Sequence, residues 1–188
     1  SVTGVQTCAL PIYAHSLKTL NMFAEYDDFI ESLGYVVDLG CGAGLDAHWW
    51  ATKTTREDNP RPLNIKVVGV DILNSAPTIV KKIPNLVYQR ANFEGELLLT
   101  YGQPFDFLWC HDSFQYAINP IQTLSNWWKI AKPNATLAIV VKQTTNIEQK
   151  NQAFVQESGT YDHHTLVSLI HMLAVSGWDC RAGFYKKL

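Results

Sequence analysis

The sequence predicts an α/β protein whose doubly wound, mostly parallel sheet carries helices on both faces. Short apolar segments alternate along the chain with longer amphipathic ones, which is the order expected of a strand–helix–strand fold. Segments such as Val67–Val70 and Leu137–Val141 contain only apolar residues and glycine, as strands buried on both faces do. Three glycines at alternate positions follow the first of the apolar segments, where a strand turns into a helix.

The expected strands are short apolar segments bounded by glycine, proline or polar residues. They are residues 35–39, 65–72, 85–92, 105–110 and 135–143, with a sixth at 178–187. The expected helices show apolar residues at spacings of three and four; they are residues 13–33, 45–53, 76–82, 121–131 and 162–177. Gly34 and Gly177 end the first and last of these helices, and Asp162 caps the last. A turn at Lys132–Asn134 is expected before the fifth strand.

The composition is that of one ordinary globular domain. The 188 residues are 47% hydrophobic and 17% charged, with a net charge of −2. Because basic and acidic residues are interspersed, no basic face is expected, and nucleic acid is not favoured as a partner. No apolar run approaches the roughly 18 residues that a membrane-spanning helix needs, so no membrane partner is expected.

The cysteines indicate neither a zinc site nor a disulfide framework. Their spacing contains no Cys-x-x-Cys pair and no Cys/His pattern suited to a metal, so no metal site is expected. Reduced thiols and a cytoplasmic location are the plain expectation for the four, which are Cys8, Cys41, Cys110 and Cys180.

The glycines after the first strand predict a ligand that lies against the main chain. Gly40, Gly42 and Gly44 have no side chains, and the helix that follows them offers free N–H groups to a carboxylate or phosphate. Asp71 ends the second strand 27 residues after Gly44, where its carboxylate can accept hydrogen bonds from both hydroxyls of a ribose. This pattern is typical of a site for a nucleoside-containing cofactor.

The spacing of the glycines distinguishes between two cofactor classes. A nicotinamide fingerprint, Gly-x-Gly-x-x-Gly, would place its third glycine at Leu45. The pattern is instead an acidic residue, Asp38, followed by the three glycines, and a carboxylate there suits an ammonium group better than a pyrophosphate. The segment resembles motif I of class I S-adenosylmethionine-dependent methyltransferases, and Val67–Ile72 resembles their ribose-binding motif. The resemblance spans residues 35–143.

The resemblance implies a Rossmann-like fold and assigns roles to individual residues. Asp38 and the glycine loop would hold the methionine part of the cofactor, Asp71 the ribose, and Ile72 the adenine. Asn92 stands where the family often has an Asp that accepts from the adenine amino group, and its amide oxygen can still accept. The full cofactor-binding set implied is Asp38, Gly40, Cys41, Gly42, Gly44, Asp71, Ile72, Asn92, Phe93 and Cys110.

The segment after the fourth strand, Cys110–Pro120, is expected to face the methyl acceptor. It is similar to the corresponding segment of small-molecule methyltransferases, which implies an acceptor pocket that includes Asp112 and Tyr116. His111 is the best candidate for a general base, needed only if the acceptor loses a proton. The alternatives are that His111 hydrogen-bonds the cofactor or a loop, that Asp112 caps a helix, and that Tyr116 packs in the core.

The function expected is methyl transfer from S-adenosylmethionine to an unidentified small molecule by in-line displacement. The sequence lacks the motif of amino-methylating DNA enzymes and the Pro-Cys nucleophile of cytosine-C5 enzymes. Two alternatives remain open, a catalytically silent cofactor-binding subunit and, with less support, a nicotinamide oxidoreductase. The acceptor and the oligomeric state cannot be deduced from the residues.

The two ends of the chain carry separate expectations. Residues 1–12 are uncharged and resemble a translated sequencing adapter at the end of a metagenomic reading frame, so they are expected to be non-native. A signal peptide would instead want a positively charged start. Residues 13–188 are expected to form one methyltransferase domain that is incomplete at its C-terminus, because the seventh, antiparallel strand of the family sheet has no counterpart.

Overall fold

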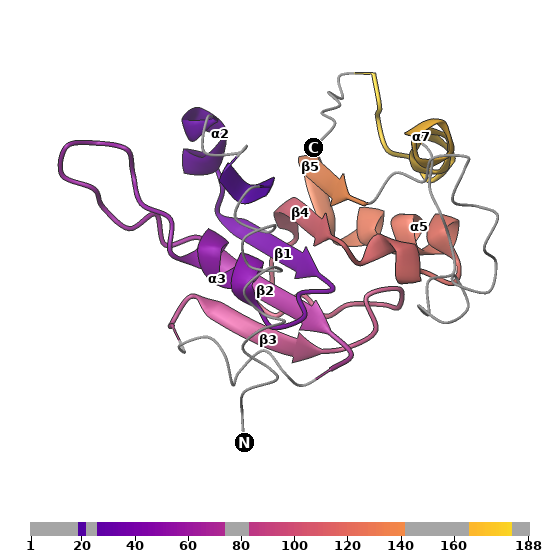
Figure 1. The fold of residues 1–188 in the computed structure, drawn as a ribbon, viewed down its shortest axis with the longest axis horizontal. Coiled ribbons are helices and arrows are strands. Elements are labelled where there is room, and N and C mark those ends of the chain that lie inside the picture. The colour runs from indigo at the N-terminus through magenta and orange to yellow at the C-terminus, as the bar shows by residue number, and fades with distance from the viewer. Residues whose placement is uncertain (1–18, 22–25, 74–82, 142–165, 182–188) are drawn as a thin grey trace, which may run out of the picture.

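The computed structural model describes residues 19–21, 26–73, 83–141 and 166–181. Its centre is a five-stranded sheet in the order β3-β2-β1-β4-β5, and every neighbouring pair is parallel (Figure 1). The strands are β1 (Tyr35–Leu39), β2 (Lys66–Asp71), β3 (Leu86–Arg90), β4 (Phe105–His111) and β5 (Ala131–Val140). The strand order reverses between β1 and β4, which is the point where open α/β sheets bind their ligands.

Helices lie on both faces of the sheet, which confirms the doubly wound prediction. In Figure 1, α3 crosses over β1 and β2, whereas α5 and α7 lie together beside β4 and β5. The helical elements are α2 (Asp27–Glu31), α3 (Leu45–Ala51), the short 3₁₀ turn η2 (Phe114–Tyr116), α5 (Pro120–Ile130) and α7 (Leu166–Val175).

The core has two halves because successive strand residues point to opposite faces. Phe107 and Trp109 face α3, where the fully buried Trp50 packs on both with its ring centroid 5.0 and 5.8 Å from theirs. Leu108 lies on the other face, in a second cluster with Trp127 of α5. Both faces of the sheet are therefore covered by buried apolar side chains, as the apolar strands predicted.

Two predicted element boundaries near the helices are wrong. The single helix over 13–33 is interrupted at Tyr26, whose dihedral angles (φ −114°, ψ 58°) are not helical; α2 begins only at Asp27. The fourth helix starts one residue earlier than predicted, at Pro120. Asn119 caps it by accepting a hydrogen bond from the Gln122 amide (3.1 Å), and proline is well suited to the first helical position.

The turn predicted at Lys132–Asn134 lies inside a strand. Ala131 already pairs with Phe105, but the next partners are Phe107 and Thr136, so the intervening residues of β5 bulge out of the ladder. Asn134 has φ +65° within this bulge, a left-handed conformation that asparagine tolerates. The turn therefore exists, but the strand begins before it.

The predicted sixth strand is wrong over residues 178–181, which the structure describes as irregular. The rest of that strand, the helix at 76–82 and the cap at Asp162 fall outside the described residues. Among the described helices, none is long and apolar enough to cross a membrane.

Candidate functional site

The glycine loop connects β1 to α3 at the carboxyl edge of the sheet. Gly40, Gly42 and Gly44 have φ angles of +79°, +50° and +79°, a conformation that L side chains rarely adopt. A Cβ on Gly40 would collide with the side chain of Ser113, and one on Gly44 would collide with the Tyr88 hydroxyl. A Cβ on Gly42 would meet no described atom within 4 Å. Gly42 is thus the glycine whose open face can receive a ligand.

Asp71 ties this loop to the end of β2. Its Oδ2 accepts a hydrogen bond from the Gly42 amide (2.8 Å), and its Oδ1 accepts one from the Leu73 amide (2.8 Å). A carboxylate has about four acceptor positions, so each oxygen can still accept from a hydroxyl. Ile72 is 58% exposed beside it, which leaves an apolar surface free to contact a ring.

Asp38 is a buried carboxylate with an unused acceptor. It lies one residue before the end of β1 and is only 2% exposed, and its Oδ2 has no hydrogen-bond partner among the described residues. Burial, followed by the charges of Asp46 and Asp71, raises the pKa of Asp38 well above its usual value, although the Ala47 amide opposes the shift. A buried acceptor without a hydrogen bond destabilises the folded state, and a cation bound beside it would offset this destabilisation.

His111, at the end of β4, is held by a carboxylate that the sequence reading missed. Oδ2 of Asp46 lies 2.8 Å from Nδ1 of His111 and 2.8 Å from Nε1 of Trp109. Asp46 is 8% exposed in the first turn of α3, where the helix dipole favours a negative charge. An acidic residue in that first turn is the one signal that could have drawn attention to it.

Asp112 and Tyr116 follow His111 on the same edge. Asp112 has φ +50°, an unusual conformation for a residue with a side chain, and its carboxylate lies 3.8 Å from Nε2 of His111. Ser113, not Asp112, precedes the short η2 helix, so the alternative that Asp112 caps a helix is wrong. Tyr116 is 43% exposed, so the alternative that it packs in the core is wrong as well.

Ser113, a second residue that sequence reading missed, joins the two loops of the site. Its hydroxyl donates to the carbonyl oxygen of Leu39 (2.7 Å) and lies 3.1 Å from Sγ of Cys110. Burial raises the pKa of Cys110 to about 12, and burial also raises the pKa of the Cys41 thiol. Both cysteines are therefore neutral thiols near pH 7, which excludes a thiolate nucleophile at either position.

Asn92 and Phe93 differ in how they are presented. Asn92 is exposed after β3, and its side-chain oxygen accepts from the Glu94 amide (3.0 Å). The Phe93 ring is buried against Trp127, with centroids 5.9 Å apart, and its edge reaches toward Gly40. Their contacts with a cofactor stay predictions, as does that of the buried Cys110.

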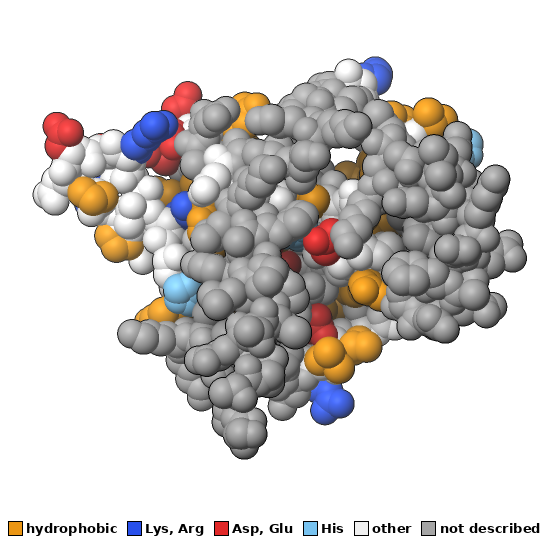
Figure 2. Space-filling model, viewed as in Figure 1, with side chains coloured by type: hydrophobic (Ala, Val, Ile, Leu, Met, Phe, Trp, Pro, Cys, Tyr) orange, Lys and Arg blue, Asp and Glu red, His pale blue; other side chains and the backbone are white. Residues whose placement is uncertain are grey.

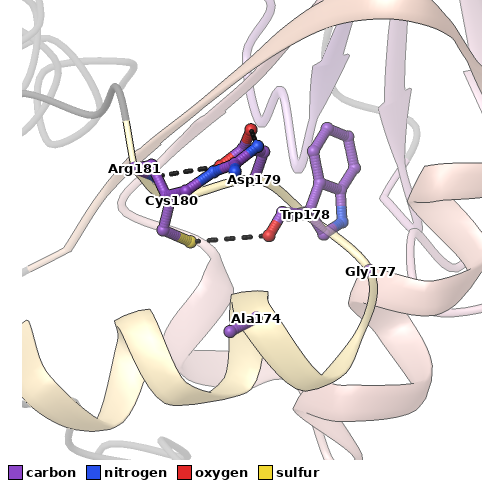
Figure 3. A pocket seen from close by; sticks show the side chains of 6 residues that line it. All are labelled: Ala174, Gly177, Trp178, Asp179, Cys180 and Arg181. Carbon is purple, nitrogen blue, oxygen red and sulfur yellow. Dashed lines mark hydrogen bonds and ion pairs between the residues drawn. The ribbon is translucent and has the colours of Figure 1, made fainter.

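Two hollows lined by described residues lie away from this edge. One of about 470 Å³ adjoins the end of α7, where Asp179 pairs with Arg181 (Figure 3). The other, of about 240 Å³, is at the amino end of the strands, beside Asp106 and Lys132.

The described residues contain no group of three or more potential metal ligands. Acidic and basic side chains are mixed on the face seen in Figure 2.

The comparisons with known proteins identify the family. A family model described as a methyltransferase domain matches residues 37–137, a range that contains most of β1, all of β2 to β4 and the whole candidate site. The chain belongs to this family of methyltransferase domains. The resemblance of its motifs to class I methyltransferases is thereby confirmed, and the expectation of an enzyme of this kind is confirmed with it.

Solved structures, among them proteins named as methyltransferases, share the fold at low sequence identity. An S-adenosylmethionine dependent methyltransferase from Mesorhizobium loti is 16% identical (TM-score 0.61; 78% of this chain and 75% of that chain covered). The YcgJ protein from Bacillus subtilis is 14% identical (0.62; 87% and 68%). Phosphoethanolamine N-methyltransferase 2 from Haemonchus contortus, in complex with S-adenosylmethionine, is 17% identical (0.61; 77% and 33%). A comparison with curated proteins finds no match.

The residues at the carboxyl edge fit S-adenosylmethionine, the cofactor of such domains. The unused oxygen of Asp38 is complementary to an ammonium group, and the open face of Gly42 admits a ligand against the backbone. Asp71 keeps acceptor positions for two hydroxyls. An amino acid joined to a nucleoside presents this combination of groups.

Proposed function

We propose that this chain transfers the methyl group of S-adenosylmethionine to a small-molecule acceptor. The observation that carries the proposal is the presence of two carboxylates at the glycine loop. Asp38 is buried with one oxygen unused, and Asp71 accepts a hydrogen bond from the Gly42 amide. In this arrangement Asp38 binds the ammonium group of the cofactor and Asp71 its ribose hydroxyls. Ile72 contacts the adenine, and Asn92 accepts from its amino group.

The bound cofactor supplies a methyl group already activated by a positive sulfonium. The acceptor forms a bond to this carbon, and the electron pair of the broken sulfur–methyl bond stays on sulfur. The protein therefore has to align the acceptor and exclude water rather than form a covalent intermediate. His111 takes the proton if the acceptor loses one, while Asp112 and Tyr116 contact the acceptor.

A small-molecule acceptor is supported by two features. The net charge is −2, and the described acidic and basic side chains are mixed on the face seen in Figure 2, whereas a nucleic-acid substrate favours a basic face. One structural neighbour is named for methylating phosphoethanolamine, a small amine. Both features concern the class of acceptor and leave its identity open.

Calorimetry with S-adenosylmethionine tests the cofactor site. Asp71→Ala should weaken binding by about 2–3 kcal/mol, since it removes charge-assisted hydrogen bonds to the ribose. This corresponds to a dissociation constant about 30- to 150-fold higher. Because Asp71 also holds Gly42, Asp71→Asn serves as a second variant that keeps one acceptor oxygen. Asp179→Ala, which removes an exposed carboxylate far along the chain, is the matched control.

An unchanged affinity in Asp71→Ala would contradict the placement of the ribose. Turnover is then followed as S-adenosylhomocysteine formed with pools of amines, alcohols and thiols. Binding of the cofactor without turnover in any pool would favour the silent cofactor-binding subunit. Binding of NADH in place of S-adenosylmethionine would favour the oxidoreductase.

A further inference from the structure

We infer that Asp46 is a positioning residue that fixes the tautomer of His111, with the proton on Nδ1 and the lone pair on Nε2. The inference deepens the proposed function, because its catalytic meaning rests on His111 as the base. It is carried by two contacts that meet at one oxygen atom, Oδ2 of Asp46.

The indole of Trp109 decides how that oxygen is used. An indole N–H can only donate, so Oδ2 of Asp46 acts as an acceptor toward Trp109 at 2.8 Å. The same oxygen lies 2.8 Å from Nδ1 of His111, and an oxygen that already accepts is best matched by a second donor. Nδ1 of His111 therefore carries a proton and donates.

Asp46 is held too firmly to change partners. The Trp109 side chain is fully buried, and its ring packs on Trp50 (5.8 Å between centroids) and on the His111 ring (5.6 Å). The side chains of His111 and Asp46 are 8% and 10% exposed. Rotation of either side chain would break a buried hydrogen bond without replacement by water.

The tautomer of His111 determines the role of its other ring nitrogen, Nε2. With Nδ1 protonated, neutral His111 has its lone pair at Nε2, on the side of Asp112, whose carboxylate is 3.8 Å away and 39% exposed. Nε2 is therefore the nitrogen that accepts a proton from the methyl acceptor, and the imidazolium so formed is stabilised by Asp46. In this relation Asp46 acts only through His111.

The tautomer can be measured without knowing the acceptor. Long-range ¹H–¹⁵N spectra of the ¹⁵N-histidine-labelled chain report which nitrogen carries the proton, and His111→Gln assigns its signals among the six histidines. The wild-type chain should show the Nδ1–H form at a pH where the ring is neutral. Asp46→Ala should lose the preference for Nδ1–H and move toward the Nε2–H form, because the oxygen that accepts from Nδ1 is gone. Asp46→Asn should keep the Nδ1–H form, because only its amide oxygen can occupy the position that accepts from the Trp109 indole. Asp112→Asn, the matched control, should keep the Nδ1–H form.

An Nε2–H form in the wild-type chain, or a rapid average of the two forms, would overturn the inference. So would an unchanged signal in a folded Asp46→Ala variant. The wild-type measurement decides by itself if that variant does not fold. Calorimetry with S-adenosylmethionine on the same samples keeps the two proposals apart. Absent cofactor binding would refute the proposed function, whereas the tautomer tests only Asp46.

Once an acceptor is found, kinetics give a second readout. Asp46→Ala should lower kcat by about 100-fold, the lower end of what a positioned base contributes, with the cofactor affinity within about twofold. The double variant Asp46→Ala/His111→Gln should be no slower than His111→Gln alone, since both act through one imidazole. Additive losses in the double variant would show that Asp46 does not act through His111 and would overturn the inference.

Discussion

Asp38 and Asp106 are carboxylates on the neighbouring strands β1 and β4, toward opposite ends of the sheet, and their surroundings are opposite. Asp106 accepts from the amides of Gly34 (3.0 Å) and Tyr35 (2.7 Å) and from the ammonium of Lys132 (2.7 Å). Asp38 is more deeply buried and has one oxygen with no partner among the described residues. Near the amino end of the sheet both oxygens of Asp106 are hydrogen-bonded, whereas near the carboxyl end one oxygen of Asp38 has no partner among the described residues.

The pKa shifts of the two carboxylates have opposite signs. Burial raises the pKa of Asp106, but Lys132 and the two amides outweigh it, and the net pKa is lowered. Its contribution to stability is therefore present above the unfolded pKa of about 3.9 and is lost as the pH falls through the lower folded value. The pKa of Asp38 is raised, so Asp38 costs stability increasingly as the pH rises from about 3.9 to its folded value. Asp106 thus stabilises the fold above its pKa, whereas Asp38 destabilises it, a cost that the proposed contact with an ammonium group would offset.

The largest effect is expected from Gly40→Ala. The added Cβ would collide with Ser113 and would hold a left-handed conformation, so the free energy of unfolding should fall by about 3 kcal/mol or more. Urea denaturation measures this directly. A loss below about 1 kcal/mol would mean that the two loops of the carboxyl end are not packed together as described.

The second-largest effect is expected from Asp106→Ala, which removes hydrogen bonds near the amino end of the sheet. Two backbone donors and Lys132 lose their partner, which should lower the free energy of unfolding by about 2–3 kcal/mol at pH 7. The difference from wild type should shrink as the pH falls below about 3.9, because Asp106 takes up a proton first in the unfolded chain and only at lower pH in the folded chain. Affinity for S-adenosylmethionine should stay within about twofold. A strong loss of affinity would show that the two ends are not independent.

Asp38→Asn should raise the stability of the ligand-free chain, whereas the two substitutions above lower it. The raised pKa of Asp38 means that folding disfavours its ionised form, so the substitution should raise the free energy of unfolding of the ligand-free chain by about 1–2 kcal/mol at pH 7, with no gain near pH 3. The same variant should bind S-adenosylmethionine more weakly, since an amide cannot neutralise an ammonium group. Thermal unfolding with and without cofactor measures both. Reduced stability without cofactor would contradict the comparison.

Gly42→Ala should change stability least. Its Cβ meets no described atom, so only the left-handed backbone is penalised, by about 1–2 kcal/mol. Cofactor affinity should fall by more than tenfold because the methyl group occupies the open face of the loop. Equal affinities for wild type and Gly42→Ala would show that the cofactor does not approach this glycine. The variant also controls for Gly40→Ala, which differs mainly in the collision.

The sequence predicted well those features that are local. The first four strands were placed to within two residues because each is an apolar run ended by glycine, proline or polar residues. The family could be predicted because its motif lies in one short segment, Asp38–Gly44, and the family model over residues 37–137 confirms it. The fifth strand began early because Ala131 pairs across a bulge that no periodicity indicates.

The missed residues depend on contacts distant in sequence. Asp46 bonds Trp109 and His111 across 63 and 65 residues, and Ser113 bonds the Leu39 carbonyl across 74. Neither belongs to a spacing pattern, because the parallel register of β1 and β4 brings them together. The predicted roles of Asp38, Asp71 and His111 concern bound molecules and remain the subject of the tests above.

The hydrogen bond from Ser113 to the Leu39 carbonyl has a consequence for engineering. The segment after β4 rests directly on the backbone that leads into the glycine loop, and Gly40 leaves room for it. Grafting that segment from another methyltransferase to alter acceptor choice would therefore disturb the nucleoside side as well, unless the graft brings a serine at this position. Exchange of both loops as one unit is the route that respects this coupling.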